Sequence, residues 1–198
     1  MMKRSALFAS ACVGMAMFGL VWSAQAADPN LEAAVRKAVS RDAQPWLAEP
    51  AVVDVVKAQN AQHKSLDQAK IDEMDNQWKA AAKSSANPLY DKIAANAVSK
   101  HLKDIKAKSN GKVAEILLMD NRGLNVAQTD STSDYWQGDE PKWQKVYTEG
   151  SDVYMTEPEK DDKSNALLTE VSVPVVDPAS KEKIGVAMIV LDTNKLGQ

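Results

Sequence analysis

The hydrophobic pattern of this chain changes period once, near Gly111, and that change limits the folds that are open to it. From residue 28 to about residue 108 there is no glycine, and apolar residues recur every three or four positions, as in helices that pack by one face. After Gly111, apolar and polar residues alternate, which is typical of half-buried strands. The pattern predicts helices followed by an antiparallel sheet, an α+β fold with the helices on one sheet face.

Punctuating residues divide the first half into four predicted helices. Pro29 suits the opening turn of the first helix, and prolines within residues 44–50 predict a bend before a valine-rich second helix. Ser65 and Gln68 have the spacing of a capping box, which predicts the start of the third. The fourth follows a break at residues 84–88 and ends at Asn110 and Gly111, which tolerate left-handed backbone.

The second half contains five strand candidates. They cover residues 113–119, 124–129, 153–156, 167–176 and 184–191. Turn residues at 120–123 and at 177–180 predict that the first two strands, and the last two, form hairpins. Pro174 has no N–H to donate, which predicts a sheet edge or a bulge near it.

Residues 1–26 have the three regions of a secretory signal peptide. Lys3 and Arg4 precede an apolar stretch that ends in small residues, which predicts cleavage after Ala26 and a periplasmic location. The remaining residues, 27–198, suffice for one domain, with a helical segment over 27–110 and a sheet segment over 111–198. The single cysteine, Cys12, lies in the leader, which excludes disulfides and thiolate metal sites from the exported chain.

The net charge of the chain argues against nucleic acid as a partner. The full chain has a formal net charge of −3, and removal of the leader takes away two positive charges and no negative ones, which leaves −5. Nucleic acid is therefore not expected as a partner.

The densest group of aromatic residues lies at 129–147, between the second and third predicted strands. This segment holds two of the four tryptophans and two of the four tyrosines of residues 27–198, among short polar side chains. Long connections within compact domains are usually functional, and ring faces with a few polar groups suit a small-molecule pocket. The segment therefore predicts a ligand site between itself and the sheet.

Four stretches carry a resemblance to a known family. They are residues 118–129 (LMDNRGLNVAQT), 133–140 (SDYWQGDE), 171–177 (VSVPVVD) and 184–187 (IGVA). Together they resemble a periplasmic Cache domain, also called a PDC or PAS-like sensor. The resemblance implies N-terminal helices packed on a five- or six-stranded antiparallel sheet, a small ligand on the far side of that sheet, and a role as the input of a histidine kinase or membrane receptor. The chain ends at Gln198 without an output module, so the expectation is a free-standing sensor that presents its ligand to such a partner.

Eight residues form the predicted ligand site. The aromatic segment contributes Asp130, Ser133, Asp134, Tyr135, Trp136 and Trp143, and the resemblance alone adds Tyr154 and Glu170.

Several of these side chains have a second interpretation. Trp136 and Trp143, seven residues apart, fit one face of a short helix that fills the core, and Asp134 fits the cap of that helix. Asp139 and Glu140 are expected to be solvated charges, and Asp120 a turn residue.

Binding of a small polar metabolite, a carboxylate or an amino acid, is the leading functional hypothesis. Lys142 and Lys145 suit an anion whereas Asp130 and Asp134 suit an amine, so the sequence leaves the charge of the ligand open. No catalytic motif, cofactor or metal site is predicted, and His63 and His101 are expected on helix surfaces.

Two other functional classes stay open. One is a periplasmic protein-interaction module, with its aromatic segment packed shut and an apolar patch on its helices. The other is a hydrolase that uses Asp134 with Asp139 or Glu140.

Overall fold

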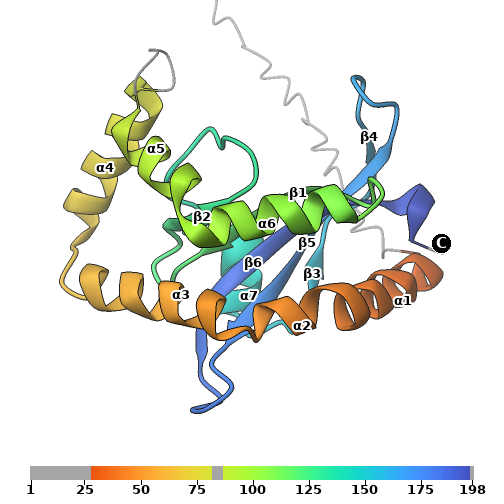
Figure 1. Ribbon diagram of the computed structural model, residues 1–198, viewed down its shortest axis with the longest axis horizontal. Coiled ribbons are helices and arrows are strands. Elements are labelled where there is room, and N and C mark those ends of the chain that lie inside the picture. Colours follow the sequence, from red (N-terminus) through yellow and green to blue (C-terminus); the bar gives the residue numbers. More distant parts are fainter. Residues whose placement is uncertain (1–27, 82–86, 197–198) are drawn as a thin grey trace, which may run out of the picture.

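The computed structural model describes residues 28–81 and 87–196, and the predicted leader with its cleavage after Ala26 lies outside them. The fold is α+β, with helices against one face of a six-stranded antiparallel sheet (Figure 1). In that view α3, α2 and α1 run along one side of the helix layer, and α6 crosses in front of the sheet. No helix among the described residues is both long and apolar enough to span a bilayer.

Seven α-helices lie in the described ranges. They are α1 (Pro29–Ala38), α2 (Gln44–Leu47), α3 (Pro50–His63), α4 (Gln68–Ala81), α5 (Pro88–Ala95), α6 (Ala97–Lys108) and α7 (Pro141–Tyr147), and a π-helical turn over Val39–Ala43 joins α1 to α2. Polar side chains cap several of them. The Asn96 side chain, for example, accepts from the backbone N–H of Ser99 at 2.7 Å, which pairs an N–H that the helix leaves free.

Two details of the predicted helices are wrong. The bend expected over residues 44–50 is shorter than predicted, because residues 44–47 form α2 and the chain breaks only between α2 and Pro50. Pro45 is tolerated in the first turn of α2, where a backbone N–H has no partner within the helix. Asp67 rather than Ser65 caps α4, since its carboxylate directly precedes the first turn and accepts from Lys70 N at 2.9 Å. The left-handed ending of α6 is confirmed, with φ of 54° at Asn110 and 76° at Gly111.

All strand pairs in the sheet are antiparallel. The strands are β1 (Val113–Met119), β2 (Asn125–Gln128), β3 (Tyr154–Met155), β4 (Glu159–Lys160), β5 (Leu167–Val176) and β6 (Lys183–Asp192), in the order β2-β1-β6-β5-β3, and β4 also pairs with β5. The five predicted strands are confirmed, and β4 is an addition that is only two residues long. A short 3-10 turn, Thr193–Lys195, follows β6.

Both predicted hairpins form. The β1–β2 turn requires Gly123, which has φ of 80° and whose absent Cβ would lie 2.5 Å from the backbone nitrogen of Gly138. In the β5–β6 hairpin, Asp177 N donates to Glu182 O at 2.9 Å. On one side Pro174 pairs with Val186 of β6, and on the other side β3 pairs only with Val171 and Ser172 of β5. Among the described residues Pro174 therefore lies at a local sheet edge, as predicted.

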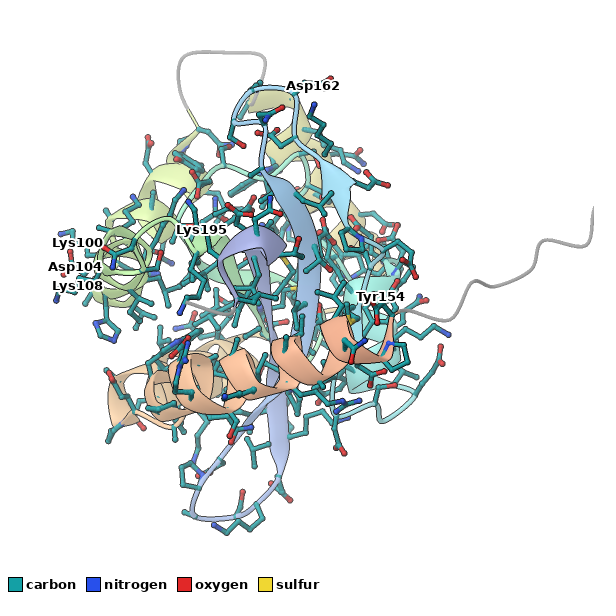
Figure 2. The ribbon with its side chains drawn as sticks, turned by 90° about the vertical axis from the view of Figure 1, so that its right-hand side faces the viewer. Lys100, Asp104, Lys108, Tyr154, Asp162 and Lys195 are labelled. Carbon is teal, nitrogen blue, oxygen red and sulfur yellow. The ribbon has the colours of Figure 1, made fainter. Side chains whose placement is uncertain are left out.

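The two faces of the sheet are covered differently. Side chains such as Ile116 and Val171 point toward the helices and join the main core, whereas Leu117 and Met188 point to the other face and pack under α7. Figure 2 shows this separation, with Lys100 and Asp104 on the outer side of α6 and Tyr154 across the sheet from them. The face under α7 is the one that the resemblance assigned to a ligand.

Candidate ligand-binding site

One rung of residues crosses the sheet on the face under α7. The strand register places Gln128, Leu117, Met188, Ser172 and Tyr154 side by side on β2, β1, β6, β5 and β3. Directly paired residues in an antiparallel sheet point to the same face, so these five side chains form one row, called here the central rung. Two polar side chains in this row thus flank an apolar pair.

The polar members of the central rung are buried and lack partners. Gln128 is 1% exposed and Ser172 0% exposed, yet among the described residues neither the amide atoms of Gln128 nor the Ser172 hydroxyl has a hydrogen bond from the protein. Leaving such a group unpaired costs about 1 to 3 kcal/mol, and buried polar groups are nearly always satisfied by protein, water or ligand. The central rung therefore offers hydrogen bonds that the protein does not use.

Helix α7 covers part of this face with aromatic side chains. Trp143 stacks on Tyr147 with ring centroids 4.8 Å apart, and both rings pack on the apolar cluster that contains Leu117 and Met188. The Trp143 indole donates to Asp120 O at 3.1 Å, and Lys183 of β6 donates to the backbone of Val146 and Tyr147. These contacts fix α7 relative to both sheet hairpins.

An acidic cleft of about 480 Å³ lies next to the central rung, toward β4. Its lining residues are Glu115, Thr156, Glu157, Glu159, Lys160, Asp161, Leu168, Glu170 and Val190. Glu115 and Glu170 both pair with Val190, so they flank that residue one rung from Leu117 and Ser172. The cleft therefore lies next to the central rung on the same face of the sheet.

The electrostatics of the cleft are set by acids in partly buried positions. Burial raises the pKa of the Glu115 carboxyl above its ordinary value, and the negative charges of Asp130 and Glu170 raise it further. Lys142 and Lys106 act in the opposite direction without reversing the shift. The folded protein therefore holds Glu115 less readily as an anion than water does.

This shift makes a prediction for stability. A carboxyl whose folded-state pKa is raised destabilises the fold above that pKa, and the effect disappears below the unfolded-state pKa, where both states are protonated. Glu115→Gln should therefore raise the free energy of unfolding of the ligand-free protein at pH 8 and leave it nearly unchanged at pH 3.5. Urea unfolding at the two pH values measures this, with the exposed Glu182→Gln as control, and equal effects at both pH values would contradict it.

The predicted site residues fall into two groups. Trp143, Tyr154 and Glu170 lie on the face under α7. Asp130 lies beside this face, where it pairs with Lys106 at 2.6 Å and acts on Glu115.

The other four predicted residues lie toward α4. Tyr135 is buried and stacks on Trp78, with ring centroids 5.5 Å apart, and Trp136 packs against the same cluster. Asp134 forms an ion pair with Lys79 at 2.8 Å, and the exposed Ser133 donates to Asp134 at 2.6 Å. The structure thus does not bring all eight predicted residues together.

The interpretation of one helix carrying both tryptophans is wrong. Helix α7 begins at Pro141, after Trp136, and the two indoles belong to different apolar clusters. Glu140 occupies the N-cap position without a side-chain cap, so Asp134 does not cap this helix. Trp136 instead pairs with Leu124 through its backbone and donates its indole N–H to Arg122 O at 2.8 Å.

The eight predicted site residues do not include Glu115, Gln128 and Ser172, which lie on β1, β2 and β5. The alternation along β5 places Ser172 on a mixed polar and apolar face, which fits either a cavity lining or an ordinary solvated strand face.

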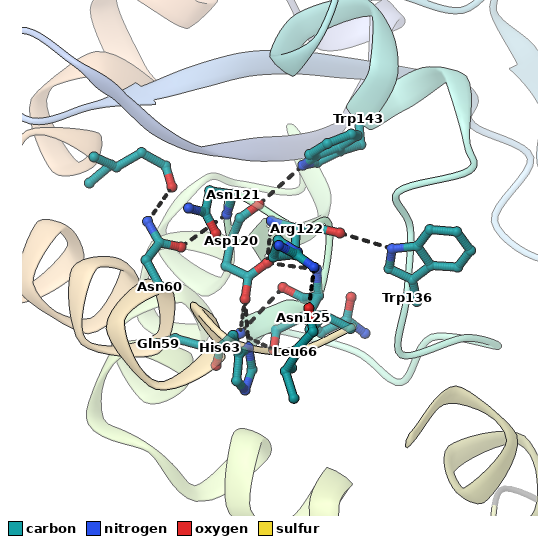
Figure 3. Close-up of polar contacts among 12 residues, drawn as sticks. Gln59, Asn60, His63, Leu66, Asp120, Asn121, Arg122, Asn125, Trp136 and Trp143 are labelled. Carbon is teal, nitrogen blue, oxygen red and sulfur yellow. Dashed lines mark hydrogen bonds and ion pairs between the residues drawn. The ribbon is translucent and has the colours of Figure 1, made fainter. Parts of the chain in front are cut away.

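The expectation of a surface His63 is also wrong. Its side chain is 13% exposed, and its Nδ1 lies 2.8 Å from the buried carboxylate of Asp120 (Figure 3). Asp120 also accepts from Gln59, Arg122 N and Leu124 N, so it holds α3 to the β1–β2 turn as well as shaping that turn. Because His63 and Asp120 are far apart in sequence, only the packing of α3 on the hairpin brings them together.

A second cavity lies on the helix side of the sheet. It measures about 370 Å³ and is lined mainly by apolar side chains of the π-helical turn, α6 and the sheet, with Asp42, Lys108 and Lys112 among its polar members. No unpaired buried side-chain atom among the described residues belongs to its lining, in contrast to the central rung. In the described ranges, no three His, Cys, Asp or Glu side chains are arranged to hold a metal ion.

Comparisons with known proteins give structural matches alone. No family model and no curated protein matches the sequence. The histidine kinase DctB sensor domain of V. cholerae is 13% identical over 84% of this chain and 54% of that chain, with a TM-score of 0.43. The E. coli DcuS sensor domain is 12% identical over 86% of this chain and 97% of that chain, with a TM-score of 0.48. The ligand-binding domain of the Pseudomonas aeruginosa amino acid chemoreceptor PctC, solved with GABA, is 15% identical over 84% of this chain and 62% of that chain, with a TM-score of 0.35.

These matches differ in how much of the other protein they include. The chain spans about half of the DctB sensor domain and nearly all of the DcuS sensor domain. The three solved structures named here are sensor or ligand-binding domains.

Proposed function

We propose that this domain binds a small polar metabolite reversibly between the central rung and α7, and that it presents the bound ligand to a membrane signalling partner in the periplasm. The partner in this proposal is a receptor or a histidine kinase. Binding rather than catalysis is proposed, because the site offers unpaired hydrogen-bonding groups beside an apolar pair, and its described residues include no assembled nucleophile and base.

One observation carries the binding proposal. Gln128 and Ser172 leave buried hydrogen-bonding atoms unpaired at two points of a single rung, with Leu117 and Met188 between them. A ligand with an apolar body and polar ends would satisfy both points and cover the apolar pair. Trp143 and Tyr147 pack on the cluster that contains this pair, so a ligand that covers the pair requires these rings to move.

The interaction-module alternative predicted an apolar patch on the helical layer. Among the described residues, the large hydrophobic side chains with substantial exposure are Leu167 and Val176, and both lie on β5. This distribution favours the ligand-binding proposal.

A thermal-shift screen of the purified protein against small metabolites tests the proposal. A ligand that binds only the folded state raises the melting temperature. Ser172→Ala should weaken the binding of any hit about tenfold, which corresponds to about 1.4 kcal/mol. The same substitution should leave the ligand-free protein as stable as before or more stable, because it removes an unpaired buried hydroxyl.

Ser180→Ala is the matched control, since it makes the same atomic change in the exposed β5–β6 turn. Its binding should equal that of the unmodified protein. If Asp134→Ala or Trp136→Ala abolished binding while Ser172→Ala had no effect, the ligand would lie at the α4 side of the aromatic segment and the proposed site would be wrong.

A further inference from the structure

The cavity of about 370 Å³ on the helix side of the sheet, called here the helix-side cavity, has an apolar interior. Buried side chains line it, with Ala43 and Trp46 on the helical side and Ile116, Ile189 and Leu191 on the sheet. Its volume lies within the range of about 300 to 1,000 Å³ that small-molecule pockets have. Apolar cavities bind apolar groups, because their lining offers water no hydrogen bonds. The interior is therefore suited to a hydrocarbon chain.

The rim of the helix-side cavity carries an excess of positive charge. Lys112 lines the cavity with a side chain that is 17% exposed, and its amine lies 3.2 Å from the carboxylate of Asp42, which also lines the cavity. Asp42 accepts two shorter hydrogen bonds from Arg41, at 2.6 and 2.7 Å. Lys108 is exposed at the rim, and its amine has no ion pair within the part of the chain that the structure describes. Three cations thus stand against one carboxylate, which favours an anionic group at the rim.

A π-helical turn supplies part of the same lining. Val39, Asp42 and Ala43 all line the cavity, and all three belong to the π-helical turn Val39–Ala43 between α1 and α2. Such turns are rare and are found frequently at functional sites. The turn is an observation independent of the charges, and it points to the same cavity.

We propose that the helix-side cavity binds a free medium-chain fatty acid, with its hydrocarbon chain against Ile116 and Ile189 and its carboxylate at Lys112 and Lys108. At roughly 30 Å³ for each methylene, about the share of one water molecule in the liquid, the cavity holds a chain of about eight to twelve carbons. The cavity lies across the sheet from the central rung, so this inference goes beyond the proposed function and does not depend on it.

Calorimetric titration of the purified protein with hexanoate, octanoate and decanoate, each below its micellar concentration, tests the inference. Each added methylene should strengthen binding about fourfold, because it leaves water for the apolar interior. Octylamine has a chain of the same length with the opposite charge, and it should bind about tenfold more weakly than octanoate. Equal affinities for hexanoate and decanoate, or for octanoate and octylamine, would overturn the inference.

Two variants test where the fatty acid lies. Ala43→Met fills part of the cavity and should weaken decanoate binding by about tenfold or more, and Lys112→Gln should weaken octanoate binding about tenfold by removing the cation at the rim. Lys100→Gln is the matched control, since it removes the same charge from the outer side of α6 (Figure 2) and should leave binding unchanged. Thermal melts show whether each variant is folded. If Ala43→Met is not, Lys112→Gln and the chain-length series decide the inference.

The outcomes separate this inference from the proposed function. If Ser172→Ala weakened decanoate binding while Ala43→Met and Lys112→Gln did not, the fatty acid would lie at the central rung, and the inference would be overturned while the proposed site would stand. If none of the three carboxylates bound, the inference would be refuted, and the metabolite screen would still decide the proposed function.

Discussion

Replacing Asp120 with alanine is expected to lower the free energy of unfolding by about 3 to 5 kcal/mol. Asp120 is 0% exposed, and its carboxylate accepts from Gln59, His63 and two backbone N–H groups of the β1–β2 turn. Alanine would leave these donors buried without a partner. It would also release the turn whose backbone carbonyl receives the Trp143 indole, so the α7 cover should loosen as well.

Urea unfolding followed by far-UV circular dichroism measures the effect of Asp120→Ala. Asp120→Asn should cost less, about 1 to 2 kcal/mol, because the asparagine oxygen can still accept from the turn. Asp104→Ala is the matched control, since this acid lies on the outer side of α6 (Figure 2) and should change stability by less than about 0.5 kcal/mol. Equal stability of Asp120→Ala and Asp104→Ala would show that Asp120 does not hold α3 to the hairpin.

The second large effect is expected at Trp78, where alanine should cost about 3 to 5 kcal/mol. The indole is 1% exposed, stacks on Tyr135 and meets Tyr90 edge-on at 5.7 Å between centroids. Its N–H donates to Thr132 O at 3.0 Å. Truncation would leave a cavity among Ile71, Ile93 and Leu124, which the surrounding helices cannot close without moving. It would also remove one of the contacts that hold residues 132–136 to α4, while Asp75 would still accept from the backbone N–H groups of this segment.

Trp78→Phe separates the two roles of this side chain. It keeps a ring in the cluster and loses the hydrogen bond to Thr132, so about 1 to 2 kcal/mol is expected. Hydrogen exchange at residues 132–136 should speed up in Trp78→Ala, while exchange in β5 should respond only through the global loss of stability. If the 132–136 amides stayed as protected as those of β5 in the alanine variant, Trp78 would not be what holds this segment to α4.

The order and type of the elements could be predicted because they depend on local pattern. The three-to-four-residue period before Gly111 and the alternation after it reflect which side chains each helix or strand must bury, and the left-handed Asn110 and Gly111 mark the boundary. The β1–β2 turn could also be predicted from local pattern, because it ends at Gly123, which adopts its φ of 80° without strain. The two-residue β4 escaped prediction, because so short a segment has no period of its own.

The candidate site depended on contacts that no local pattern contains. The sequence shows that Glu115, Gln128 and Ser172 are polar residues of predicted strands, but only the strand register aligned Gln128 and Ser172 in one rung and placed Glu115 opposite Glu170 across β6. Likewise, the aromatic segment was visible as a run of rings, yet the packing of α4 drew Tyr135 to Trp78 and left Trp143 over the sheet. The physical reason is that burial and hydrogen-bond pairing are properties of residues brought together from distant parts of the chain, whereas the period of a helix or strand is a property of neighbours.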